Sequence, residues 1–111
     1  MTDYSKMTDE QVNEAIARIK GVGYGIEIIN GRPMVATIDI GRYAELPRYT
    51  HDWRLAGELL EELGQSTPVE LTRLHNLDKW GFGITGNEPD VYGSTPQRAI
   101  CEAWLAWKEK A

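Results

Sequence analysis

His51 and Asp52 stand next to each other, a pair of residues that can bind the metal ion of a phosphohydrolase. Such a site needs further His and Asp ligands from several helices of a larger helical domain. The other histidine, His75, lies in a predicted turn. We therefore expect the oxygen of Thr50 or Asp52 to cap a helix, where it accepts a backbone N–H.

Other residues with reactive or ligating side chains also have simpler structural explanations. Asp39 and Asp78 have no spacing that joins them to the histidines as a metal site. The glycines of segment 21–25 follow a helix and precede a strand, which is the reverse of a phosphate-binding loop. Cys101 lies inside a predicted helix without a histidine partner and is expected to be a core residue. We predict no catalytic residue, no metal and no cofactor; a small hydrolase is the least favoured alternative.

Tyrosine and arginine side chains gather in two predicted loops, residues 39–50 and 86–94. Such residues on loops often supply the main contacts of protein interfaces. The sequence therefore predicts a non-enzymatic binding module that presents these loops to a partner. The candidate contacts are Arg42, Tyr43, Arg48, Tyr49 and Tyr92.

A second hypothesis is the capture of a small ligand, such as a nucleotide second messenger. Arg42, Arg48 and Arg98 could contact its phosphates, and aromatic side chains could stack on its bases. A nucleotide that binds only the folded chain would raise its thermal stability.

The composition narrows the classes of partner. The chain has 111 residues, 41% of them hydrophobic, and a formal net charge of −5. These values predict one domain over residues 1–111 with a modest core. An acidic chain is a poor candidate for binding nucleic acids or anionic membranes. A single cysteine and no recognisable signal peptide indicate the cytoplasm. An edge strand of the predicted sheet can pair with the same strand of a second copy, so the sequence is compatible with a homodimer.

The pattern of apolar residues and caps predicts the order α-β-β-α-β-β-α. Thr8 and Gln11 form a capping box for a first helix that ends at Gly21 or Gly23. Strands are expected at 25–29, 34–38, 69–74 and 80–85, with a hairpin at Asn30-Gly31. A central helix runs from Thr50 or Asp52 to Gly64, and Thr95 caps the last helix. Apolar residues on both faces of the first hairpin suggest that helices or loops cover part of each side of the sheet. The four tryptophans are expected to fit core faces and pack together, with the alternative that one of them is partly exposed as a binding anchor.

Three segments resemble small phage proteins with the ABA-sandwich domain. The opening MTDYSKMTDEQVNEAIA (1–17) is similar to the start of NinX-type proteins. YTHDWRLAGELLEEL (49–63) resembles the central helix of the family, and TPQRAICEAWLAW (95–107) resembles its last helix. The resemblance implies an α/β/α sandwich around a small, mainly antiparallel four-stranded sheet. It also implies a phage or prophage accessory protein in the bacterial cytoplasm, where the partner would be a host protein.

Overall fold

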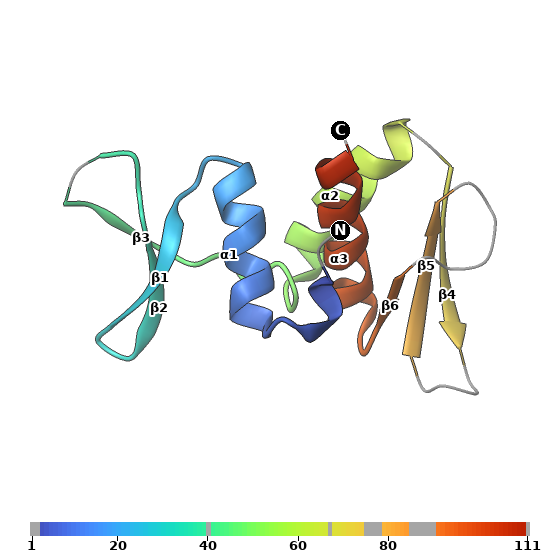
Figure 1. The fold of residues 1–111 in the computed structure, drawn as a ribbon, viewed down its shortest axis with the longest axis horizontal. Coiled ribbons are helices and arrows are strands. Elements are labelled where there is room, and N and C mark those ends of the chain that lie inside the picture. Colours follow the sequence, from blue (N-terminus) through green and yellow to red (C-terminus); the bar gives the residue numbers. More distant parts are fainter. Residues whose placement is uncertain (1–2, 40, 67, 75–78, 85–90, 111) are drawn as a thin grey trace.

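Two small antiparallel sheets lie at opposite ends of the molecule, with three helices between them (Figure 1). The computed structural model describes residues 3–39, 41–66, 68–74, 79–84 and 91–110. Sheet A consists of β1 (Tyr24–Ile29), β2 (Arg32–Ala36) and β3 (Tyr43–Glu45). Sheet B consists of β4 (Val69–Leu74), β5 (Lys79–Ile84) and β6 (Val91–Gly93). The helices are α1 (Asp9–Ile19), α2 (Trp53–Ser66) and α3 (Pro96–Lys110), and a short 3-10 turn (Tyr4–Lys6) precedes them.

Helix α1 begins at the predicted capping box. The Thr8 hydroxyl accepts from the Gln11 backbone N–H, and the Gln11 side chain accepts from the Thr8 backbone N–H. The helix ends before Gly21, whose φ of +76° suits glycine. Val12 and Ile16 face the interior and are fully buried. The cap and the apolar stripe therefore position α1 against the other helices.

Sheet A is built on the predicted Asn30-Gly31 hairpin. Both residues have positive φ, 52° and 78°, as a tight two-residue turn requires. Val35 pairs with Ile26 on one side and Ala44 on the other. Val35 packs with Ala17 of α1 and with Leu46 in a small core of its own. Sheet A thus rests on α1 through few buried residues.

The main core lies between the helices and sheet B. Asp52 caps α2 as expected, with its carboxylate accepting from the backbone N–H groups of Arg54 and Leu55. The Thr95 hydroxyl accepts from the Arg98 N–H and caps α3. The larger core includes buried side chains from all three helices, together with Phe82 of β5. It fastens sheet B to α3, which contacts β5 and β6.

The structure corrects the predicted layering. The fold is α+β with antiparallel strands, but its order is α-β-β-β-α-β-β-β-α, with two three-stranded sheets instead of one four-stranded sheet. Helices lie between the sheets, so the α/β/α sandwich is wrong (Figure 1). The missed strands, β3 and β6, have three residues each and fall in the predicted loops. Such short strands are too brief to show an alternating pattern.

Of two smaller expectations, one fails. Helix α2 continues past Gly64 to Ser66, because Gly64 is not among the positive-φ glycines of the described residues. The tryptophans follow the alternative with one exposed member: Trp104 is buried, Trp80 and Trp107 pack half-buried against the main core, and Trp53 is exposed.

Candidate functional site

The candidate contact residues do not form one surface. Tyr43 lies on β3 of sheet A, and Tyr92 lies on β6 of sheet B, at the other side of the helices (Figure 1). Arg42 is exposed in the connection between β2 and β3, where its backbone bonds to Thr37. Residues 86–90 of the second predicted loop lie outside the described residues. The structure therefore does not bring Tyr43 and Tyr92 into a single compact interface.

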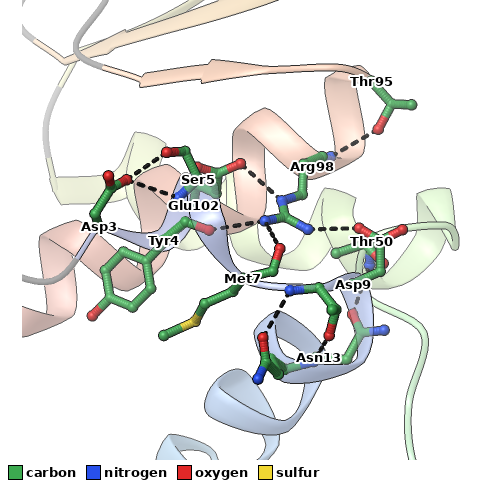
Figure 2. Close-up of polar contacts among 12 residues, drawn as sticks. Asp3, Tyr4, Ser5, Met7, Asp9, Asn13, Thr50, Thr95, Arg98 and Glu102 are labelled. Atoms are coloured by element: carbon green, nitrogen blue, oxygen red, sulfur yellow. Dashed lines mark hydrogen bonds and ion pairs between the residues drawn. The ribbon is translucent and has the colours of Figure 1, made fainter.

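Two residues named for binding are engaged inside the fold. Tyr49 is 4% exposed and packs in the main core, so its ring is not available to a partner. Arg98 is buried, and its guanidinium donates to Glu102, Asp9 and the backbone oxygens of the N-terminal segment (Figure 2). It cannot supply the phosphate contact of the nucleotide hypothesis without leaving these partners.

Exposed apolar side chains concentrate on sheet A. Of the eight large hydrophobic side chains that are exposed among the described residues, four lie on strands of sheet A, one lies in the connection after β2, and one is the last residue of α1. The others are Trp53 and Tyr92. The six are Ile19, Tyr24, Ile26, Ile28, Ile38 and Tyr43. We call Tyr24, Ile26, Ile28 and Tyr43 the β1 surface.

The register places the β1 residues of this surface on both faces of an edge strand, with Tyr43 of β3 beside them. Ile26 pairs with Val35, which faces α1, so Ile26 and Ile28 share that face. Tyr24 pairs with Ala36, which pairs with Tyr43, so the two tyrosines share the outer face. Tyr24 is 54% exposed and Ile28 is 65% exposed. Sheet A is therefore covered only in part: α1 buries Val35, whereas Ile28 on that face and Tyr24 on the other stay exposed.

Polar groups hold the β1 surface in place. Glu27 accepts a hydrogen bond from the Tyr43 hydroxyl, and this bond raises the pKa of Tyr43. Glu14 of α1 accepts from the Gly25 N–H at 2.9 Å and pairs with Arg18 at 2.9 Å. The Arg18 guanidinium lies 6.0 Å from the centre of the Tyr24 ring. These contacts fix the start of β1 relative to α1.

A polar cleft of about 180 Å³ opens between α1 and the end of sheet A. We call it the α1–β2 cleft. Its walls come from the first turns of α1, from β2, and from the segment between β3 and α2. The lining residues are Asp9, Glu10, Asn13, Pro33, Leu46, Arg48 and His51.

His51 belongs to a short chain of polar contacts at this cleft. Its Nε2 lies 3.5 Å from Asp9 Oδ2, and its Nδ1 lies 3.0 Å from the Thr50 hydroxyl. Asp9 Oδ1 in turn accepts from Arg98 at 2.6 Å. A hydroxyl, an imidazole and a carboxylate in line are the parts of a nucleophilic triad. Thr50 is only 2% exposed, however, so a substrate cannot reach its hydroxyl.

Cys101 is placed as the sequence predicted. The side chain is fully buried in the main core, and burial raises the pKa of its thiol to about 12. A nucleophilic cysteine needs the opposite shift, because the thiolate is the reactive form. The described residues include no group of three or more His, Cys, Asp or Glu side chains arranged to hold a metal ion.

Sequence reasoning missed the residues that the structure exposes most clearly. Ile26 and Ile28 lie in the predicted strand 25–29, and Tyr24 directly precedes it. The signal was their presence on both faces of a strand without Lys or Pro, the usual devices that protect an edge. Asp9 belongs to the predicted capping-box segment of the first helix, and nothing local in the sequence indicates that α1 meets the segment before α2.

Comparison with known proteins supports the fold. No protein-family model matches the chain, and no curated protein matches it. The chain is similar in structure to a phage protein from Bacillus cereus, known from a 2.0 Å crystal structure. The TM-score is 0.65 at 21% sequence identity, over 96% of this chain and 97% of that one. This structural relative is a phage protein, in agreement with the resemblance of the three sequence segments, and the comparisons name no family. Among the described residues, no helix is long and apolar enough to cross a membrane.

Proposed function

We propose that this protein is a phage or prophage accessory protein that works as a non-enzymatic binding module in the bacterial cytoplasm. The binding surface is the β1 surface, and the partner is a host protein that places an extended strand beside β1. The phage assignment is supported by the structural relative, which is a phage protein. The main support for the site is the exposure of apolar side chains on both faces of β1.

Strand addition fits this surface better than docking of a flat face. β1 is the first strand in the order β1-β2-β3 and pairs only with β2 within the described residues. An edge strand offers unpaired backbone N–H and C=O groups to an incoming strand. Side chains of the added strand would then cover Ile26 and Ile28 on one face and Tyr24 on the other.

The test is a capture experiment with the tagged chain in bacterial lysate, followed by titration of the captured protein. Ile28→Lys places a charge at the edge and is expected to abolish capture. Ile38→Lys is the control, because Ile38 is exposed in the connection after β2 and not on β1. Equal capture by both variants would contradict the proposal.

A second pair of variants separates the two ends of the molecule. Tyr24→Ala is expected to weaken binding about tenfold or more, as for a buried aromatic contact. Tyr92→Ala, on a similarly exposed tyrosine of sheet B, is expected to leave it unchanged. Weaker binding by Tyr92→Ala, with unchanged binding by Tyr24→Ala, would place the binding site on sheet B. A wild-type chain that sediments as a dimer, and as a monomer when Ile28→Lys is present, would show that a second copy supplies the strand.

A further inference from the structure

The register of sheet A shows which backbone groups of β1 are open to an added strand. Ile28 pairs with Pro33, whose carbonyl oxygen accepts from the Leu46 N–H on the β3 side of β2. Because Pro33 also has no N–H to donate, this pair exchanges no hydrogen bond. Backbone groups alternate between the two sides of an antiparallel strand. The N–H and C=O groups of Ile28, and those of Ile26 two residues earlier, therefore point away from β2 toward the open edge.

The open part of β1 is limited at both ends. A register shift falls at Gly25, whose φ is +70°. The Gly25 N–H donates to the Glu14 carboxylate of α1 at 2.9 Å, so it is not available to another strand. At the other end, β1 turns into the hairpin after Ile29. An added strand can therefore bond to two residues of β1, Ile26 and Ile28.

Glu27 lies between these two residues, and alternation places its exposed side chain on the outer face of sheet A, with Tyr43. The Tyr43 hydroxyl donates to the Glu27 carboxylate. Arg32, the cation of β2, pairs with Glu45 of β3 at 4.0 Å. Within the described part of the chain, no cation forms an ion pair with Glu27. A side chain that an added strand places beside Glu27 therefore meets a negative charge.

A second copy of the chain is a poor partner for this edge. Two antiparallel copies that use both open residues must pair Ile26 of one copy with Ile28 of the other. That register sets Glu27 of one copy directly opposite Glu27 of the second, on the same face of the joined sheet. Cross-strand neighbours have Cβ atoms about 4.5–5.5 Å apart, where like charges are destabilising. A charged side chain in this position is a device that protects an edge strand from pairing with itself.

We propose that Glu27 sets the specificity of the β1 surface: it rejects a second copy and selects a partner strand with the pattern apolar–basic–apolar. This specificity rests on the proposed addition of a strand to β1. The two apolar side chains of the added strand lie beside Ile26 and Ile28, and the Lys or Arg between them lies beside Glu27 on the outer face. The net charge of −5 also favours the approach of a basic segment.

The experiment is a titration of the isotope-labelled full chain with three short peptides, followed by nuclear magnetic resonance. Each peptide has a valine on either side of a central lysine, threonine or glutamate, and the three are otherwise identical. We expect saturable shifts of the backbone amides of residues 26–28. The lysine peptide is expected to bind about fivefold more tightly than the glutamate peptide, since one cross-strand contact changes from repulsion to attraction.

Charge reversal at position 27 tests the residue itself. Glu27→Lys is expected to invert the order, so that the glutamate peptide binds about fivefold more tightly than the lysine peptide. Glu70→Lys is the matched control, because it makes the same change of charge on an exposed residue of sheet B and should keep the wild-type order. An equimolar mixture of the wild type and Glu27→Lys is expected to sediment as a dimer at concentrations where each protein alone is a monomer, because the mixed pair sets opposite charges face to face.

Three results would each overturn the proposal. The first is equal affinity for the three peptides, which would leave strand addition at β1 intact and remove the role of Glu27. The second is a wild-type chain that dimerises through β1, with the dimer lost in Ile28→Lys. The third is that no peptide shifts the amides of residues 26–28 at millimolar concentration, which would remove strand addition at β1 together with this specificity.

Discussion

The Arg98 guanidinium on α3 lies 2.6 Å from the carboxylate of Asp9 at the start of α1, although 89 positions separate the two residues. The same guanidinium bonds to Glu102 at 2.8 Å and to the backbone oxygens of Tyr4 and Met7 (Figure 2). One side chain thus joins the N-terminal segment, α1 and α3. Through Asp9 it also holds the carboxylate that faces His51 in the α1–β2 cleft.

Replacement of Arg98 by alanine is expected to lower the free energy of unfolding by about 3 kcal/mol, because it leaves the buried Glu102 carboxylate without its cation. Burial raises the pKa of Glu102, and the Arg98 guanidinium opposes that rise. Chemical denaturation monitored by circular dichroism measures the loss. Arg54→Ala is the control, because Arg54 is exposed and pairs with Glu58 within the same helix. Similar losses of unfolding free energy in Arg98→Ala and Arg54→Ala would show that Arg98 does not hold the N-terminal segment, α1 and α3 together.

The contacts of the Glu62 carboxylate lead us to expect that the protein loses stability in acid. Partial burial alone would raise the pKa of its carboxyl group, but bonds from Lys108 and Trp104 and the nearby charge of Lys20 lower it overall. A carboxyl group with a lowered pKa in the folded state stabilises the fold above its unfolded pKa, near 4.5. The contribution is lost as the pH falls through the lower, folded value.

The matching variant is Glu62→Gln, which cannot ionise. We expect it to lower the free energy of unfolding by about 1 kcal/mol at pH 7. Its unfolding free energy should then decline less than that of the wild type between neutral pH and pH values below 4.5. Urea denaturation at several pH values measures both quantities. Parallel curves for the two proteins would contradict this role of Glu62.

Local signals in the sequence predicted the helices and the long strands well. The caps at Thr8, Asp52 and Thr95 act through hydrogen bonds to residues two or three positions away, so their effect is contained in short segments. The Asn30-Gly31 turn is also local, because the φ values of two adjacent residues decide it. Each of these features is specified without knowledge of the tertiary structure.

The layering and the site depend on contacts between distant segments. β3 exists because Ala44 pairs with Val35, and neither residue alone indicates a strand. Tyr49 looked like an exposed loop residue, but the segment before α2 folds into the main core. The exposure of Ile28 follows from its position on a strand at the edge of a sheet that rests on one helix. Alternation of residue types cannot distinguish an edge strand from a central one.

Two glycines provide a matched test of the packing between sheet B and α3. A Cβ on Gly93 would lie 2.5 Å from the backbone N of Ala99, so β6 and α3 would have to separate. Gly93→Ala is expected to lower the unfolding free energy by about 2 kcal/mol. A Cβ on Gly57 in α2 would meet no atom within 4 Å, so Gly57→Ala is expected to raise it by about 0.5–1 kcal/mol. Thermal unfolding of both variants checks the opposite signs; two changes of the same sign would show that β6 does not pack as described.

Cys101 is expected to resist modification as long as the chain is folded. The side chain is fully buried, and with a pKa of about 12 only about one thiol in ten thousand is ionised at pH 8. A thiol reagent such as dithionitrobenzoate should therefore react slowly with the native chain and rapidly in strong denaturant. Arg98→Ala, which loosens the turn of α3 next to Cys101, is expected to speed the native reaction by the factor by which it raises the unfolded population, because exposure then requires unfolding. Rapid modification of the native wild type would mean that this part of α3 opens independently of the rest of the core.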